Sequence, residues 1–411
     1  MTQSTSSPEI TELSDTKSAI DESLQFTIDK QLKHVKSLNE QGNLMANANM
    51  QEEALESFER ALEILHCVYG NDNINMAELM DNIGIILANL RRYDAAILRF
   101  EQAKAIRTSN LSSNHPSLAT SAANIGETYR KMGKFKLALH HFNKATTICD
   151  SHYGPSHPIS ATMLEAVAQI NHHLGKYKEA LETYNKVLTL KRQLYGTTHL
   201  ETADTIHNMA VTYQALKNYE RAMHLFRQAL AVYQEKSRSP GQTANALKNI
   251  AITYSRQGDH KNAIDYFRRA LDTETREFGV QHINTANTLG NLGAAYARVG
   301  KFDEATSRCK TALKITIQYN GLAHVDVATA HHNLGTVKLS QGLVKKAKKH
   351  FKESHRIYVA SFGAAHRKSR RERKLLRRIG RIASSTNGRK LKTRIIGYEC
   401  TGGKGPLTSF T

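Results

Sequence analysis

The sequence is poor in residues that interrupt helices and in large aromatic side chains. Its 411 residues include only 6 Pro and 24 Gly, contain no Trp, and are 7% aromatic. So few turn-forming residues in a chain of this length favour long helices. An interior without Trp must be built mainly from Ala, Leu and Ile, which suits helices packed on helices. The composition therefore predicts an all-α fold.

Membrane-spanning runs and paired cysteines are also missing. The apolar residues come in short periodic groups, too short to cross a bilayer as one continuous apolar helix. The four cysteines lie far apart without a CxxC motif, which excludes a disulfide framework and a zinc ribbon. The first thirty residues carry six acidic residues and two lysines, unlike a secretory or transit peptide. These features predict an intracellular protein.

Most of the net charge of +20 lies near the C-terminus. Between Leu343 and Arg394 there are 19 basic residues, and the acids are Glu353 and Glu372, so this segment carries +17 of the total. The rest of the chain is nearly neutral. One basic end on a neutral body indicates a localised electrostatic role rather than polyanion binding along the whole length.

A three-residue motif recurs with a period of about 42 residues. It consists of Asn, an apolar residue and then Gly or Ala, at successive spacings of 42, 84, 41, 42 and 42. Ala166-Val167-Ala168 fills the double interval in phase. We call the Asn residues of this motif the Asn ladder: Asn82, Asn124, Asn208, Asn249, Asn291 and Asn333.

A second motif keeps the same phase, an Ala followed four residues later by an aromatic residue or once by Cys309. It begins at Ala54, Ala96, Ala138, Ala180, Ala222, Ala263, Ala305 and Ala347. Glycines such as Gly133 and Gly300 lie between the motifs, where a tight turn is expected. Small residues let two helices approach closely, and the aromatic side chain fills the space beside the crossing. Each period therefore predicts a helical hairpin, and such hairpins stack into a solenoid.

The order of residues within one period resembles the tetratricopeptide repeat. One copy contains Gly126, Tyr129, Gly133, Ala138, Phe142 and Ala145. Between repeats an aromatic-Gly pair precedes His, as in Tyr153-Gly154 to His157, and with the 42-residue period this resembles the repeats of kinesin light chains. The resemblance implies an all-α superhelical solenoid of about eight hairpins with a C-terminal capping helix. It also implies a non-catalytic adaptor that binds an extended peptide of a cargo protein in its concave groove.

We expect four segments. Residues 1–29 form a disordered acidic segment, residues 30–363 the repeat solenoid, residues 364–383 a basic capping helix, and residues 384–411 a disordered tail.

The apolar residues near the N-terminus form about two heptads. They are Leu24, Ile28, Leu32, Val35 and Leu38. This is too short for the coiled coil through which kinesin light chains join the motor heavy chain, so we assign these residues to the first helix of a leading repeat. Association with kinesin is then expected only through another subunit.

No enzyme signature is found, and we expect no catalysis, no cofactor and no bound metal. The sequence has no HExxH, GxSxG, Walker or dinucleotide-binding motif. Six histidines recur at the repeat period: His115, His157, His199, His282, His324 and His366. Whole helices separate these copies by roughly 10 Å or more, too far apart to converge on one metal ion. We assign them to the linkers between repeats.

The Asn ladder is the first candidate binding site. A side-chain amide can bind both N–H and C=O groups of an extended peptide. The alternative is that each Asn bridges neighbouring repeats. Basic residues in the same phase face the predicted groove and favour an acidic peptide: Arg130, Lys131, Lys248, Arg256 and Arg298.

The second candidate is a basic patch in the predicted capping helix. It consists of Arg367, Lys368, Arg370, Arg371, Arg373, Lys374, Arg377 and Arg378. An apolar stripe of Leu375, Leu376, Ile379 and Ile382 predicts that this helix packs on the last hairpin. Arg377 stands where a small residue would be needed for another crossing, so we expect a single helix. The patch is a solvated cap, a nuclear import signal, or a site for RNA, anionic lipid or the acidic microtubule surface.

Two functions remain open. The first is a cytoplasmic, cytoskeleton-associated adaptor that binds a partner protein through an extended peptide. The second is a nucleic-acid-associated or nuclear protein that uses the basic helix while the repeats recruit a partner. Polyanion binding should weaken steeply with salt, and groove binding much less.

Overall fold

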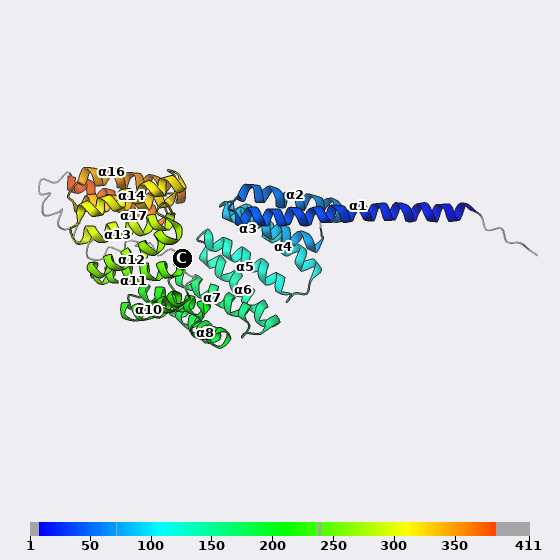
Figure 1. The fold of residues 1–411 in the computed structure, drawn as a ribbon, viewed down its shortest axis with the longest axis horizontal. Helices are drawn as coiled ribbons and strands as arrows, with labels where there is room; N and C mark the ends of the chain where they lie inside the picture. The colour runs from blue at the N-terminus through cyan, green and yellow to red at the C-terminus, as the bar shows by residue number, and fades with distance from the viewer. Residues whose placement is uncertain (1–7, 71, 237–239, 384–411) are drawn as a thin grey trace, which may run out of the picture. The chain divides into compact units, whose positions relative to one another are not determined.

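The chain folds into helices only. A computed structural model describes residues 8–70, 72–236 and 240–383, and within them it contains 17 α-helices and no strand (Figure 1). The first helices of successive hairpins are α1 (Pro8–Asn47), α3 (Ile74–Asn89), α5 (Pro116–Lys131), α7 (Pro158–His173), α9 (Leu200–Ala215), α11 (Pro240–Gln257), α13 (Ile283–Arg298) and α15 (Val325–Ser340). None of the helices in these ranges is long and apolar enough to cross a membrane.

The second helices complete eight hairpins. They are α2 (Gln51–Tyr69), α4 (Tyr93–Asn110), α6 (Phe135–Tyr153), α8 (Tyr177–Tyr195), α10 (Tyr219–Glu235), α12 (His260–Phe278), α14 (Phe302–Asn320) and α16 (Val344–Phe362), and α17 (Arg367–Ala383) follows the last of them. The predicted all-α solenoid of eight hairpins with a C-terminal capping helix is confirmed.

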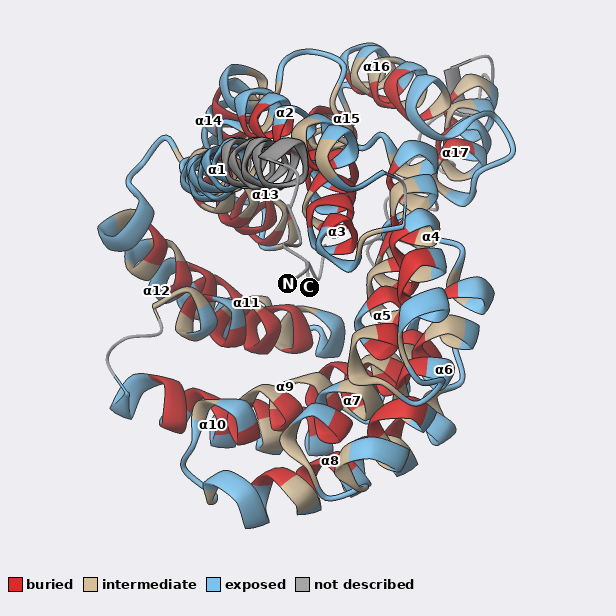
Figure 2. Cartoon of the chain, turned by 90° about the vertical axis from the view of Figure 1, so that its right-hand side faces the viewer, coloured by how far each residue is buried: buried red, intermediate tan, exposed pale blue. Residues whose placement is uncertain are grey.

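The hairpins belong to two compact units, Met1–Leu194 and Tyr195–Thr411. In the first unit the second helix of one hairpin packs on the first helix of the next, in the pairs α2–α3, α4–α5 and α6–α7. The second unit repeats this order in α10–α11, α12–α13, α14–α15 and α16–α17. Each helix buries one side against its neighbours and exposes the other (Figure 2). A hairpin therefore depends on the next one to cover its apolar surface.

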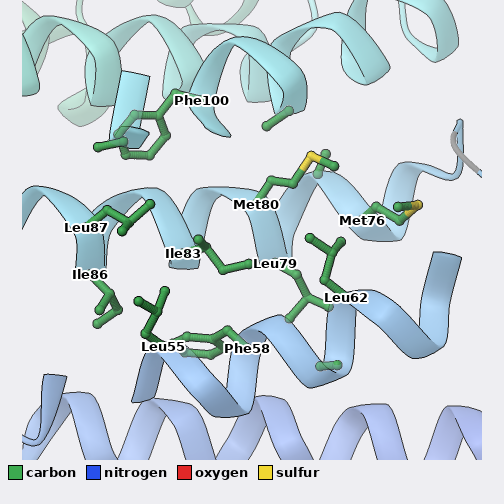
Figure 3. Close-up of a cluster of buried hydrophobic side chains, with 14 of the residues drawn as sticks. Leu55, Phe58, Leu62, Met76, Leu79, Met80, Ile83, Ile86, Leu87 and Phe100 are labelled. Atoms are coloured by element: carbon green, nitrogen blue, oxygen red, sulfur yellow. The ribbon is translucent and has the colours of Figure 1, made fainter. Parts of the chain in front are cut away.

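The helix crossings are as close as the small residues predict. All eight Ala residues of the second motif are fully buried. A Cβ atom added to Gly84 would lie 2.6 Å from the ring of Phe100, and one added to Gly42 would lie 2.6 Å from the ring of Phe58. Figure 3 shows these two rings on opposite sides of α3, with Ile83 between them. Only a very small residue fits at these crossings.

The linker histidines cap the helices that follow them. In each of the six linkers the His Nδ1 accepts a hydrogen bond, 3.2 or 3.3 Å long, from the backbone N–H two residues later. In the linkers of His157, His199, His282 and His366 the preceding aromatic ring packs on the imidazole, with 4.5 Å between the ring centroids of Tyr153 and His157. The intervening Gly154 has φ +86° and ψ 157°, a conformation that is almost restricted to glycine. The aromatic-Gly-x-x-His pattern thus ends one helix and begins the next.

The first helix differs from the expectation. Residues 8–29, expected to be disordered, lie in α1, because no Pro or Gly interrupts the chain between Glu9 and Gln41 and the helix of the first hairpin continues through its polar end. Leu38 is buried in the first core cluster, with Leu32 and Val35 packed against it, as predicted for a leading repeat. Residues 1–7 and 384–411 lie outside the described residues.

The capping helix packs as predicted. In α17, Leu375 is 6% exposed and Ile379 is fully buried, and both join a core cluster with Phe351 of α16. Arg377 is exposed to solvent. Because Arg377 stands where the other first helices have a small residue at the crossing, no second helix packs on this side of α17 within the described residues.

Two hairpin turns contain a basic residue and the first contains Asn49 at the position where the other turns have glycine. Arg91 (φ +62°) and Lys217 (φ +64°) take the left-handed conformation that Gly133 (φ +73°) has in its own turn. A side chain there costs roughly 1 kcal/mol. We expect Arg91→Gly and Lys217→Gly each to raise the free energy of unfolding by about 0.5 to 1 kcal/mol in urea denaturation. The control Gly133→Ala should lower it by a similar amount, and unchanged midpoints in all three variants would contradict the prediction.

Candidate functional site

Three positions in each hairpin meet beside the helix crossing. The first is the residue just before the Asn ladder position. The second is the aromatic position, 19 residues after the first, and the third lies 26 residues after the first. The first and third carry an ion pair in three hairpins. The distances are 2.7 Å from Arg107 Nη1 to Asp81 Oδ2, 2.6 Å from Lys191 Nζ to Glu165 Oε2, and 2.8 Å from Lys248 Nζ to Glu274 Oε1. We call these three positions the crossing triad.

The ion pairs are internal to the fold. Lys191 is 2% and Glu274 1% exposed. Burial raises the pKa of Asp81, and the guanidinium of Arg107 opposes this shift. Because removing one partner would leave the other charge buried and unpaired, these pairs constrain the two helices of a hairpin to each other.

In the hairpin of α13 and α14 the crossing triad is unusually small. It consists of Gly290, Cys309 and Thr316, where the preceding hairpin has Lys248, Phe267 and Glu274. The missing side-chain volume leaves a small recess, with room for about one water-sized group, between α13, α14 and α15. Its lining residues are Ala286, Asn287, Gly290, Cys309, Ala312, Thr316, Asp326, Thr329, Ala330 and Asn333.

The recess has an apolar floor and a polar rim. Cys309, Ala312 and Thr316 of α14 are buried and form the floor. Asn287, on α13, and Asn333, on α15, are half-buried at the rim. α13 and α15 also contact each other directly, so two first helices form the walls. The opening therefore lies on the side of the first helices, where the sequence places its candidate groove.

Three members of the Asn ladder bridge neighbouring hairpins. The amide of Asn82 donates to Asn39 Oδ1 at 3.1 Å, and that of Asn124 hydrogen-bonds to Asp81. Asn249 Nδ2 lies 3.0 Å from His207 Nε2. Each bond reaches the first helix of the preceding hairpin at the position just before the ladder position, which Glu40 occupies in the first hairpin. For these three residues the structure favours the bridging role over the groove role.

The other ladder residues lie in the second unit. Asn291 is only 4% exposed, and Asn208 is half-buried on α9. Asn333 differs from the bridging residues. The residue of the preceding hairpin to which it would bond is Gly290, which has no side chain. A Cβ atom added to Gly290 would lie 3.0 Å from Asn333 Nδ2. The amide of Asn333 therefore lines the recess instead of bonding to a side chain at that position.

The rim carries one carboxylate. Asp326 Oδ2 accepts a hydrogen bond from Asn320 Nδ2 at 3.2 Å and lies 3.4 Å from His324 Nδ1. The hydroxyls of Thr329 and Tyr358 are 2.9 Å apart. The recess can thus accept and donate hydrogen bonds at its rim.

Burial raises the pKa of the Cys309 thiol to about 12, so at neutral pH this group is neither a thiolate nucleophile nor a metal ligand. Within the described residues no group of three His, Cys, Asp or Glu side chains is placed to hold a metal ion. The recess offers hydrogen bonding and packing rather than covalent chemistry.

The predicted groove cations separate into two groups. Arg130 donates two hydrogen bonds of 2.6 Å to Glu127, and Lys131 Nζ donates to Asn89 Oδ1 at 3.1 Å. Lys248 is not a free groove cation, because the buried carboxylate of Glu274 requires its charge. Arg256 is exposed near the end of α11, and Arg298 is half-buried at the end of α13. The last two lie 42 residues apart at the same register.

The predicted basic patch lies on α17. Its exposed members are Arg367, Arg370, Arg373, Lys374, Arg377 and Arg378, while Lys368 and Arg371 are half-buried. Lys368 Nζ lies 5.5 Å from the ring centroid of Tyr358 and 5.7 Å from that of Phe362. Lys368 therefore contributes to packing as well as to charge.

The bridging and open asparagines should respond differently to substitution. Asn249→Ala removes the partner of a half-buried imidazole, that of His207, so we expect the free energy of unfolding to fall by about 1 to 2 kcal/mol. Asn333→Ala removes an amide that faces the recess and should change it by less than about 0.5 kcal/mol. Urea denaturation of both variants tests this. Equal losses would mean that Asn333 also serves as a bridge.

Stability should also fall in acid because partly buried histidines must remain neutral. Burial, with the nearby charge of Lys248, lowers the pKa of His207 to about 4. The stability that the folded chain gains from a neutral His207 is complete above the pKa of about 6.5 in the unfolded chain, and it is lost as the pH falls toward 4. His172 and His350 have pKa values lowered to about 4 in the same way.

The His207 contribution can be isolated with His207→Gln, which keeps an acceptor for Asn249 but does not titrate. Denaturation at pH 7 and pH 4.5 should show a loss of stability that is about 2 kcal/mol smaller in the variant than in the natural chain. Equal losses in both proteins would exclude His207 as a source of the acid sensitivity.

Comparisons with solved structures show the same fold at low sequence identity. The apo form of the quorum sensor NprR from B. thuringiensis is 13% identical over 82% of this chain and 99% of its own, with a TM-score of 0.55. A Rap protein complexed with Competence and Sporulation Factor is 14% identical over 85% and 98%, with a TM-score of 0.50.

The kinesin light chain resemblance receives less support. The repeats of a putative kinesin light chain from Podosopora anserina are 19% identical over 50% of this chain and 98% of their own, with a TM-score of 0.43. This likeness is too low to assign the chain to the kinesin light chain type. No curated protein sequence matches the chain.

The sequence profile of the tetratricopeptide repeat matches five stretches of the chain, of which the first two overlap and the last two overlap. They are residues 37–109, 75–151, 153–235, 242–308 and 284–360. The matches cover nearly all of the stacked hairpins, and the repeated crossings of Gly or Ala, Ala and an aromatic residue account for them. The chain belongs to the tetratricopeptide repeat family.

Proposed function

We propose that the protein is a non-catalytic scaffold that binds an extended peptide of a partner protein on α13 and α15, with one peptide side chain in the recess. The observation that carries this proposal is the crossing triad of Gly290, Cys309 and Thr316, which opens a recess where the preceding hairpin is filled by Lys248, Phe267 and Glu274. The family and fold support a protein partner in general.

The polar rim suits a peptide backbone. Asn287 and Asn333 each supply amide donors and a carbonyl acceptor, which can pair with the N–H and C=O groups of an extended chain without reading its sequence. The floor of Cys309, Ala312 and Thr316 favours a small side chain. Asp326 at the rim favours one that donates a hydrogen bond, such as Ser or Thr.

An acidic residue elsewhere in the peptide would be attracted to the ends of α11 and α13. Arg256 and Arg298 lie there at equivalent positions of adjacent hairpins. Along α13, Arg298 lies eight residues beyond Gly290, which is about 12 Å at 1.5 Å per residue. About four residues of extended peptide span that distance. We therefore propose a ligand with a small polar residue and an acidic residue about four positions apart.

The cargo-adaptor role, kinesin or microtubule association, and a cytoplasmic location remain predictions from the resemblance of the repeats. The Rap structure contains a bound factor, and NprR is named as a quorum sensor. At 13 to 14% identity these proteins share the fold, and their ligands are not transferred to this chain.

Filling the recess should abolish peptide binding without unfolding the protein. Gly290→Asn places at this position the side chain that Asn39 uses to bond Asn82. The new amide would meet Asn333 and occupy the recess. We expect peptides selected on the full-length natural chain from a displayed random 12-residue library to bind the variant at least tenfold more weakly, as measured by fluorescence polarisation.

The matched control is Asn82→Ala, which alters a ladder residue in the other unit. It should lower stability while leaving the selected peptides bound with unchanged Kd. Circular dichroism and urea denaturation establish that Gly290→Asn remains folded. Undiminished binding to a folded Gly290→Asn variant, or equal loss in the control, would contradict the proposed site.

A further inference from the structure

The outward side of α17 is a continuous basic surface. At 3.6 residues per turn, Arg370, Arg377 and Arg381 lie opposite the fully buried Ile379. Four more exposed basic residues flank them: Arg367, Arg373, Lys374 and Arg378. We call these seven residues the basic face.

The neighbouring helix α16, which packs on α17, extends the positive charge. It exposes its own stripe at spacings of four, three and four residues: Lys345, Lys349, Lys352 and Arg356.

The two acidic residues of α16 and α17 are already engaged. Glu372 is 2% exposed, and its Oε1 lies 2.7 Å from His332 Nδ1 on α15. Glu353 forms an ion pair of 2.5 Å with Arg356. The basic face itself consists only of Arg and Lys. Charges gathered this way repel one another, so their arrangement favours an external polyanion.

The packing of α17 argues against a bilayer as that polyanion. An amphipathic helix binds membranes by burying its apolar side among the lipids. In α17, Leu375 and Ile379 are instead buried against Leu339, Ala347 and Phe351. The apolar side is occupied by the protein, and only charge remains outside.

The composition of the basic face distinguishes two kinds of nucleic acid. Proteins that bind single strands place aromatic side chains where bases can stack. The basic face has none. Its six arginines and one lysine match phosphate oxygens instead, which guanidinium groups bind with two parallel hydrogen bonds. A helix of 17 residues is about 25 Å long, and a duplex offers one phosphate charge per about 1.7 Å of its axis.

From these observations we propose that the basic face binds the phosphate backbone of double-stranded nucleic acid without reading its sequence. Duplex DNA and duplex RNA share this chemistry. The proposal is independent of the peptide site, because it involves none of the recess residues.

The test is a titration of a fluorescent 20-base-pair duplex with the full-length chain at 50, 100 and 200 mM salt. Removing one cation that neutralises a phosphate should reduce the slope of log K against log salt by about 0.9. The combined Arg370→Gln, Arg377→Gln and Arg381→Gln variant should therefore bind at least tenfold more weakly at 50 mM salt, with a slope smaller by about 3. Gln preserves helix propensity, so weaker binding by this variant reports charge.

A matched variant removes three exposed lysines from the other unit, Lys136→Gln, Lys144→Gln and Lys186→Gln, and should keep both affinity and slope. DNA and RNA duplexes run in parallel identify the source of the phosphate. The proposal fails if no duplex binds at 50 mM salt, if both variants lose affinity equally, or if a single strand of the same length binds more tightly. It also fails if vesicles containing phosphatidylserine displace the duplex in competition.

Discussion

The fold depends on the close crossing of two helices within each hairpin. A Gly or Ala in the first helix meets a fully buried Ala in the second, and an aromatic ring, replaced by Cys309 in one hairpin, fills the space one turn away. Dispersion and burial stabilise such a contact only when the two surfaces fit, so a side chain added at Gly84 or Gly335 would collide with Phe100 or Phe351. The need for small residues at each crossing explains why these residues recur with a period of about 42.

The crossing also determines where the chain can vary. Beside it lies the crossing triad, whose first and third members form an ion pair in three hairpins. Asp81 with Arg107 and Lys248 with Glu274 place opposite charges in reversed order, which shows that the pair matters more than the sign at either position. When all three members are small, as in the hairpin of Gly290, the same geometry yields a recess. One packing arrangement thus produces both rigid hairpins and a candidate binding site.

The fold could be predicted from the sequence because each helix crossing needs small and aromatic residues, and these residue types recur with the repeat period. Hairpin number, linker histidines and the capping role of α17 all follow from that period. Residues 8–29 were missed because their acidic composition suggested disorder, although nothing in the sequence interrupts the helix. The role of the Asn ladder could not be predicted from the sequence for a physical reason. Asn82, which bonds to Asn39, and Asn333, which faces the recess, occupy the same position of the repeat and are the same residue type. The spacing of 26 residues between complementary charges could have identified the ion pairs within the hairpins.

The two proposed sites share one element, α15. Asn333 forms part of the recess, and His332, the residue before it, bonds Glu372 of the basic helix at 2.7 Å. Adjacent residues of a helix point in different directions, so α15 contacts the recess on one side and α17 on another. A ligand in the recess that shifted α15 would change how α17 packs and therefore how tightly α17 binds its own ligand. By linkage, a ligand on α17 would change the binding free energy of the recess ligand by the same amount. Because packed helices resist small displacements, that coupling depends on whether His332 and Glu372 keep their bond when either ligand binds.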